Sequence, residues 1–291
     1  MQQIEIIECP RDAMQGIKQW IPTAQKIRYA QSLLKVGFDV LDIGSFVSPK
    51  AIPQMQDTAA VLAGLDRSES KTELLTIVAN ERGAISACAE PEVDWLGYPF
   101  SISENFQMRN THKTIDASQV LLDGLLNLCE KNNKGLVVYL SMGFGNPYGD
   151  PWSPDIVAKW IEVLSAKGVK IISLSDTVGA ASVETIGALF STIIPAFPQL
   201  RIGAHLHVKA TDALEKIDRA YKSGCRRFDV AIKGYGGCPM AKDELIGNLP
   251  TEKILTYCTT HKITHQLNPL HFEVAYNQAL QTFPYKGFSF L

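Results

Sequence analysis

Two histidines separated by one residue, in the run His205-Leu206-His207, give the strongest chemical signal in this chain. They end an apolar segment, residues 200–204, that is typical of a β-strand. Side chains two positions apart on a strand share one face. Two imidazoles roughly 6–7 Å apart on that face can converge on one divalent cation. Because such pairs also occur as ordinary, partly buried histidines, the metal hypothesis depends on ligands elsewhere in the chain.

Asp12 and Asn248 are the candidates for those further ligands. Asp12 follows the first strand-like run, and Asn248 lies in the last third of the chain. With the histidines they offer two nitrogens and two oxygens, a set that suits octahedral Mg²⁺ or Mn²⁺ better than a closed structural zinc site. Asp12 could instead cap the helix that follows the first strand, with Arg11 as its ion-pair partner.

The elements that must position these residues repeat one unit, an apolar strand followed by a turn and an amphipathic helix. Several helices end in a glycine before the next strand, namely Gly37, Gly168 and Gly224, which predicts left-handed helix stops. Eight such units indicate parallel strands joined by right-handed crossovers, and therefore an α/β fold, a (β/α)₈ TIM barrel. We expect residues 1–291 to form a single catalytic domain of this kind. The expected strands are residues 4–8, 39–43, 74–78, 93–97, 136–140, 170–174, 200–206 and 227–232, and the expected helices include 24–36, 115–132, 154–167, 183–194, 213–223 and 249–261.

Several polar residues fall near the C-terminal ends of these strands, where TIM barrels carry their active sites. Asp42 lies in the second strand, Asp176 follows the sixth, and Cys238 lies in the loop Gly236-Gly237-Cys238-Pro239 after the eighth. Either carboxylate could hydrogen-bond a metal ligand, and Asp176 could equally cap the next helix. A thiol in a glycine-rich loop beside a cation can take part in proton transfer, but the same loop could be a phosphate-binding turn with an incidental cysteine.

The composition indicates a globular cytoplasmic protein. The chain has 291 residues, 46% hydrophobic content and a formal net charge of −2, with no basic tract that would indicate nucleic-acid binding. Its apolar runs fall short of the roughly 18 residues that a membrane span needs. The first expected strand begins at Ile4, so we expect no signal or transit peptide. The six cysteines show no CxxC spacing and are expected to be free thiols.

These motifs together resemble the hydroxymethylglutaryl-CoA lyase family, which belongs to the metal-dependent barrels named for a DRE-type motif in the first strand. The resemblance spans nearly the whole chain. It is carried by Pro10-Arg11-Asp12 with Gln15, Ser45-Phe46-Val47-Ser48-Pro49-Lys50, Ser103-Glu104-Asn105-Phe106, Ser173-Leu174-Ser175-Asp176-Thr177, His205-Leu206-His207, Gly236-Gly237-Cys238-Pro239 and Gly247-Asn248-Leu249-Pro250.

The resemblance implies a retro-Claisen-type cleavage of 3-hydroxy-3-methylglutaryl-CoA, or of a related 3-hydroxyacyl-CoA, to acetyl-CoA and a keto acid such as acetoacetate. An acyl-CoA thioester is thus the expected partner, and a homo-oligomer, a dimer, is the expected assembly. The cofactor implied is a divalent cation, Mg²⁺ or Mn²⁺, which lowers the pKa of the substrate hydroxyl. Its implied ligands are Asp12, His205, His207 and Asn248.

Four further residues receive catalytic roles from the resemblance. Arg11 would stabilise the developing oxyanion, because its charge is fixed. Cys238 would help to protonate the enolate carbon. Asp42 and Asp176 would assist proton transfer or orientation.

Two alternatives stay open at this stage. One is another carbon–carbon bond enzyme of the same barrel superfamily, such as a 4-hydroxy-2-oxo acid aldolase, although such an enzyme would not be expected to need the Cys238 loop. The other is a catalytically inactive binding scaffold. It is motivated by two departures from the family pattern, Asp42 in place of the usual glutamate and Val208-Lys209 in place of an Asp-Thr pair. The retained candidate ligands argue against it.

Overall fold

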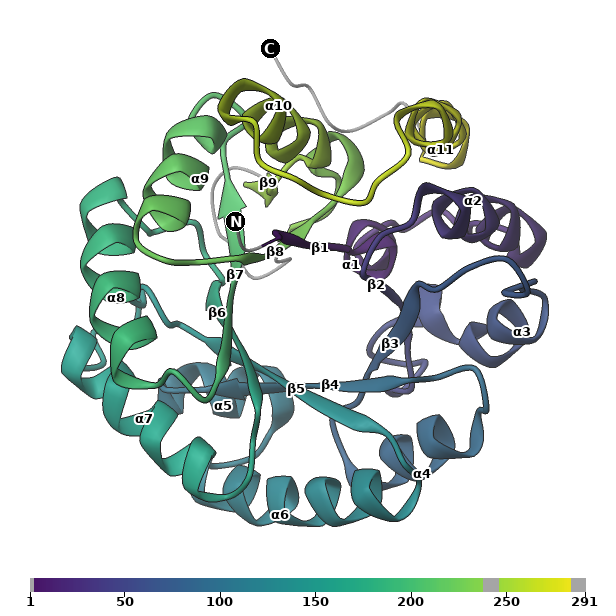
Figure 1. Cartoon of the computed structure of the whole chain (residues 1–291). Helices are drawn as coiled ribbons and strands as arrows, with labels where there is room; N and C mark the ends of the chain where they lie inside the picture. Colours follow the sequence, from purple (N-terminus) through teal and green to yellow (C-terminus); the bar gives the residue numbers. More distant parts are fainter. Residues whose placement is uncertain (1–2, 238–245, 284–291) are drawn as a thin grey trace.

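Eight parallel strands form a closed ring in the computed structural model, which describes residues 3–237 and 246–283. The ring runs in the order β6-β5-β4-β3-β2-β1-β8-β7, and β6 also pairs with β7 (Figure 1). Helices surround the ring, so the predicted TIM barrel is confirmed. The strands are β1 (Glu5–Glu8), β2 (Val40–Ser45), β3 (Glu73–Ile77), β4 (Trp95–Ser101), β5 (Gly135–Ser141), β6 (Ile171–Asp176), β7 (Arg201–Val208) and β8 (Arg227–Val230).

The strands are buried on both faces, and most of their residues are apolar because both faces are covered. One face fills the barrel interior, and the other packs against the surrounding helices. All eight predicted strands are present, although their ends are shifted. The interior cluster consists of Ile7, Cys9, Val40, Leu75, Val137, Tyr139 and Ile171.

The six predicted helices are also present, with small differences at their ends. Gly37, Gly168 and Gly224 have φ values of 86°, 105° and 101°, so the predicted left-handed stops are confirmed. These helices are α2 (Thr23–Val36), α6 (Ile115–Lys131), α7 (Pro154–Ala166), α8 (Val183–Ala196), α9 (Ala213–Lys222) and α10 (Thr251–His261).

Several further elements, most of them short, were not predicted. The most consequential is α1 (Pro10–Gln15), because Arg11 and Asp12 lie inside this helix and not in a turn. Pro10 occupies its first position, where a missing N–H costs nothing. The other elements are α3 (Thr58–Ala63), α4 (Glu81–Ala89), α5 (Glu104–Thr111), α11 (Pro269–Thr282), the 3₁₀ helices η1 (Pro53–Met55) and η2 (Ile232–Gly234), and strand β9 (Gly247–Asn248), which pairs antiparallel to β7.

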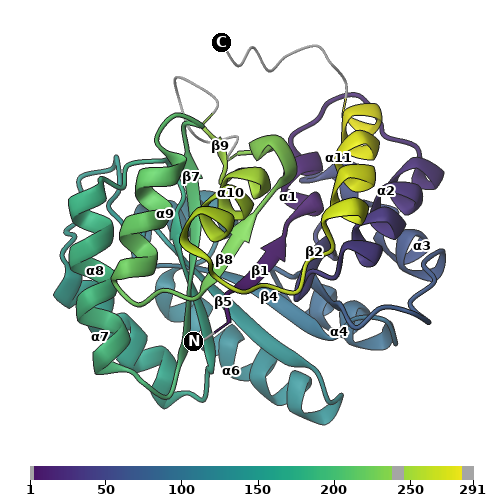
Figure 2. The ribbon, with the colours of Figure 1, turned by 45° about the horizontal axis from the view of Figure 1, so that its top comes forward.

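Helix α11, near the end of the chain, lies beside α2, near its beginning (Figures 1 and 2). The Asn268 amide donates to the Val36 carbonyl at 2.8 Å, and the Tyr29 and Phe283 rings meet edge to face at 5.6 Å. An early and a late helix of the chain are thereby joined on the outer surface of the barrel. Within the described ranges, no helix has the length and apolar character that crossing a membrane requires.

Candidate functional site

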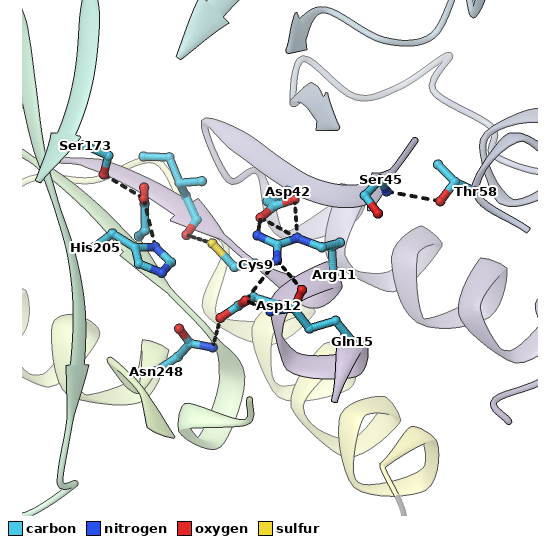
Figure 3. A network of polar contacts seen from close by, with 12 residues as sticks. Cys9, Arg11, Asp12, Gln15, Asp42, Ser45, Thr58, Ser173, His205 and Asn248 are labelled. Carbon is cyan, nitrogen blue, oxygen red and sulfur yellow. Dashed lines mark hydrogen bonds and ion pairs between the residues drawn. The ribbon is translucent and has the colours of Figure 1, made fainter. Parts of the chain in front are cut away.

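His205 and His207 share one face of β7 and point into the mouth of the barrel, as their spacing predicted. Asp12 reaches the same point from α1, and Figure 3 shows Asp12 and His205 on opposite sides of this space. One candidate ligand atom from each of these three residues lies within 4.8 Å of the other two. All three side chains are buried.

Asn248 joins this cluster from β9, in direct register with His207 on β7. Its Nδ2 donates to Asp12 Oδ2 at 2.7 Å and to the carbonyl oxygen of Tyr235 at 2.8 Å. These two acceptors fix the orientation of the amide, so Oδ1 is the atom that Asn248 can offer to a cation. The structure therefore brings together all four residues that the sequence predicted as metal ligands.

The charge of the cluster suits a cation. Burial alone would raise the pKa of Asp12, but Arg11 and the two histidines lower it to about 2, so the carboxylate is ionised. Burial and the neighbouring His205 lower the pKa of His207 to about 4, which leaves a neutral imidazole with a free lone pair near pH 7.

His207 also provides a test of whether a metal fits. Its Nδ1 is buried, and it has no hydrogen-bond partner within the described part of the chain. A buried polar nitrogen without a partner is costly, and a bound ion or water would relieve that cost. A carboxylate oxygen, an amide oxygen and two imidazoles are ligands that Mg²⁺ or Mn²⁺ accepts. The residues present thus fit a divalent cation.

Arg11 lies beside Asp12 and is held by three side chains (Figure 3). Its Nε and Nη2 donate to the Asp42 carboxylate, while Nη1 donates to Asp12 and to Gln15, each at 2.9 Å. Burial opposes the charge, but Asp42 and Asp12 raise the pKa of Arg11 above its ordinary value. The site therefore holds a fixed positive charge next to the candidate metal ligands. Asp42 orients this guanidinium from strand β2.

Asp176 is placed differently from the other predicted residues. In β6, Ser173 contacts Asp229 in the barrel interior, so alternation directs Asp176 outwards. Its carboxylate accepts the amides of Ala180 at 2.8 Å and Ala181 at 3.0 Å, in the loop before α8, and burial raises its pKa to about 6. These contacts are those of a residue that shapes a loop. A catalytic role for Asp176 stays a prediction.

Cys238 lies outside the described residues, but the glycines before it are described. Gly236 has a φ of 92°, and a Cβ there would lie 2.6 Å from the Asp12 carbonyl oxygen and 2.7 Å from Asn248 Nδ2. Only glycine fits so close to the site. The predicted glycine-rich loop therefore begins in direct contact with the candidate metal ligands Asp12 and Asn248.

Asp229 is a site residue that the sequence reasoning missed. It lies on β8 opposite His205, and its Oδ2 is 3.2 Å from His205 Nδ1. Burial raises its pKa, but Arg227 and the contact with His205 bring it below the ordinary value. The sequence signal for Asp229 was the run Arg227-Phe228-Asp229-Val230, in which two charged residues share one face of a short strand.

A separate open cleft of about 800 Å³ lies at the other end of the barrel. It is lined by Leu34, Gly37, Phe38 and Thr72, among others, which precede β2 and β3. None of the predicted site residues lines it. The chemistry therefore belongs to the C-terminal ends of the strands, as in other TIM barrels.

Comparisons with known proteins agree with this arrangement. A family model described as HMGL-like matches residues 3–276. The chain is 33% identical over 246 residues to the hydroxymethylglutaryl-CoA lyase YngG of Bacillus subtilis, which covers 84% of this chain and 81% of that protein. It is 32% identical, with the same coverage, to a 3-hydroxy-3-isohexenylglutaryl-CoA/hydroxymethylglutaryl-CoA lyase of Pseudomonas aeruginosa.

A solved structure is similar over nearly the whole chain. It is an HMG-CoA lyase from Acinetobacter baumannii in complex with coenzyme A and 3-methylmalate. It matches with a TM-score of 0.88 and 26% sequence identity, covering 96% of this chain and 91% of that one.

Proposed function

Because the chain belongs to the HMGL-like family and within it to the hydroxymethylglutaryl-CoA lyases, we propose that it cleaves 3-hydroxy-3-methylglutaryl-CoA to acetyl-CoA and acetoacetate. The observation that carries this proposal is the buried Asp12, His205 and His207 cluster beside a fixed arginine charge. Carbon–carbon cleavage of a 3-hydroxy thioester needs both parts of this arrangement. One part must favour loss of the hydroxyl proton, and the other must stabilise the enolate that is released.

The reaction balances without an external oxidant or reductant. The C3 hydroxyl loses its proton, its oxygen forms the ketone of acetoacetate, and the bond between C2 and C3 breaks. The electron pair of that bond passes to C2 and the thioester carbonyl as an enolate, and C2 then takes up a proton to give acetyl-CoA.

Arg11 is suited to stabilise the enolate oxygen. A guanidinium has five N–H groups. The Asp42 carboxylate accepts hydrogen bonds from the Nε–H and from one N–H of Nη2, while Asp12 and Gln15 accept the two N–H groups of Nη1. Among the described residues, the last N–H on Nη2 stays available, and we propose that it donates to the developing enolate oxygen. Asp42 acts as the positioning residue that aims the guanidinium.

Asp12, His205, His207 and Asn248 would hold the cation, which we propose to be Mg²⁺ or Mn²⁺. When bound, it acts as a Lewis acid that makes the substrate hydroxyl easier to deprotonate. Asp12 is the carboxylate of the cluster, and we propose that it receives the hydroxyl proton, because the cation would lower the pKa of that hydroxyl toward the pKa of the carboxylate. We propose that Cys238 supplies the proton to C2 and that Asp176 assists by shaping the loop before α8.

We further propose that residues 1–291 act as one catalytic domain in a cytoplasmic homodimer that binds acyl-CoA and neither nucleic acid nor membranes. The net charge of −2 supports the absence of a nucleic-acid partner. Size-exclusion chromatography with light scattering tests the dimer, since a monomer mass near 32.0 kDa would contradict it.

The activity is tested by measuring acetyl-CoA release from 3-hydroxy-3-methylglutaryl-CoA with Mg²⁺, with Mn²⁺ and with EDTA. We expect release that depends on the cation and that falls by about 100-fold or more in Arg11→Met, since one oxyanion donor is worth that much. Cys238→Ala should also lose activity, whereas Cys129→Ala, which removes a buried thiol on α6, should not.

The relative from Pseudomonas aeruginosa suggests a second substrate, 3-hydroxy-3-isohexenylglutaryl-CoA. If acetyl-CoA were released from this thioester and not from 3-hydroxy-3-methylglutaryl-CoA, the proposed substrate would be the thioester with the bulkier acyl group. Release of pyruvate from a 4-hydroxy-2-oxo acid would favour the aldolase alternative. Cation binding without turnover of any thioester would favour the scaffold alternative.

A further inference from the structure

A buried carboxylate lies directly behind one of the candidate metal ligands. Asp229 on β8 and His205 on β7 are paired in register, and both side chains point into the barrel. Asp229 Oδ2 lies 3.2 Å from His205 Nδ1, and the two residues are 2% and 8% exposed. The contact is therefore shielded from water.

The Asp229 carboxylate is itself held by two further donors. Arg227 Nη1 donates to Oδ1 at 2.9 Å, and Ser173 Oγ donates to Oδ2 at 2.8 Å. Arg227 supplies the opposite charge that a buried carboxylate needs. Each oxygen of Asp229 thus has a fixed donor besides His205, so the carboxylate cannot turn away from the imidazole without losing a bond.

This contact determines which nitrogen of His205 carries the proton. An ionised carboxylate only accepts hydrogen bonds, so the proton of a neutral imidazole facing it must be on Nδ1. Nε2 then carries the lone pair that a cation requires. The Tyr139 and His205 rings meet edge to face, with centroids 5.5 Å apart and an interplanar angle of 82°, which limits rotation of the imidazole.

His207 shows the contrast. Its Nδ1 has no partner in the described ranges, whereas His205 Nδ1 has Asp229. The two candidate ligands are therefore supported unequally, and the fixed one is His205.

We propose that Asp229 is a positioning residue that holds His205 in its Nδ1–H tautomer and aims Nε2 at the divalent cation. This inference rests on the metal site proposed above. Outer partners of this kind typically contribute 10- to 100-fold to metal affinity. Arg227 and Ser173 act indirectly, because their hydrogen bonds hold the Asp229 carboxylate in place.

The first test is Mn²⁺ affinity, measured by electron paramagnetic resonance without substrate. Asp229→Asn should bind Mn²⁺ about 10- to 100-fold more weakly than wild type, because the amide loses the charge and can present an N–H to His205. Ser173→Ala keeps the carboxylate and should lose less affinity. Glu8→Gln, which makes the same acid-to-amide change at an equally buried carboxyl group that contacts Thr251 of α10, should bind like wild type.

A second measurement needs no variant of Asp229. With ¹⁵N-labelled histidine, the His205 signals of the metal-free wild type, assigned by loss in His205→Gln, should show the Nδ1–H tautomer near pH 8. Wild-type Mn²⁺ affinity in a folded Asp229→Asn, or an Nε2–H tautomer, would overturn the inference. A wild type that binds no Mn²⁺ would overturn the metal site itself, and Asp229 would then have no cation to act on.

Discussion

Replacing Glu8 by glutamine should make the protein progressively more stable than wild type as the pH rises. Glu8 lies on the outer face of β1 with no exposed surface. It accepts the Ile232 amide at 2.8 Å and the Thr251 hydroxyl at 2.6 Å. Burial raises its pKa from 4.5 to about 8 despite these two hydrogen bonds. The folded protein thus keeps a proton here that the unfolded chain releases.

The sign and size follow from this difference. Below the pKa that Glu8 has in the unfolded chain, Glu8 is protonated in both the folded and the unfolded state, and its contribution to the free energy of unfolding is fully present. Between pH 4.5 and about 8, each pH unit lowers the free energy of unfolding by about 1.4 kcal/mol. Glutamine stays neutral, so its variant lacks this slope. Between about pH 5.5 and about pH 8.5, Glu8→Gln should gain roughly 3 kcal/mol relative to wild type.

The assay is urea unfolding followed by tryptophan fluorescence, with both proteins measured at about pH 5.5, 7 and 8.5. Glutamine can accept from Ile232 and donate to Thr251, so it reproduces the contacts of the protonated acid. Glu5→Gln on the same strand is the control, because its carboxylate reaches solvent, where it contacts Arg201. A stability gap for Glu8→Gln that does not widen with pH would refute the reasoning.

Three further perturbations probe the site and the core. Gly236→Ala should lower kcat at least tenfold, measured by acetyl-CoA release, because its Cβ would collide with the Asp12 carbonyl. Asp42→Asn should lower kcat through misplacement of Arg11 while Mn²⁺ affinity, measured by paramagnetic resonance, changes little. Phe228→Ala, at a side chain with no exposed surface, should cost about 3–5 kcal/mol in urea unfolding.

Each of these has a result that contradicts it. Full activity in Gly236→Ala would mean that the loop does not need its close approach to the site. A large loss of Mn²⁺ affinity in Asp42→Asn would assign Asp42 to the metal and not to Arg11. A cost below about 1 kcal/mol at Phe228 would show that the core between β8 and the helices can repack freely.

The barrel and the histidine pair of the candidate metal site could be predicted because both depend on simple periodicities. Strands that alternate with helices in the sequence must pair in parallel. The polar residues that follow parallel strands then all lie at the same end of the barrel. His205 and His207 followed from the two-residue period of a strand. Asp12 and Asn248 followed from residue type and position in the chain.

Other features could not be read in this way. Helix α1 and strand β9 are too short to show a period, although they position Asp12 and Asn248. Asp176 was grouped with the site because it ends a strand, but the alternation of β6 directs it outwards. Asp229 lies inside strand β8 and not in the loop after it, so the rule that active-site residues follow the strand ends does not identify it.

The hydrogen bond between Asp12 and Asn248 joins residues that are 236 positions apart in the chain. Asp12 follows the first strand of the barrel, and Asn248 comes after the last. The four candidate ligands therefore come together only when the ring has closed, and a partly folded chain in which either end has not docked lacks at least one of them. Cation binding should then report on barrel closure during refolding, and a saturating cation should slow the separation of β1 from β8.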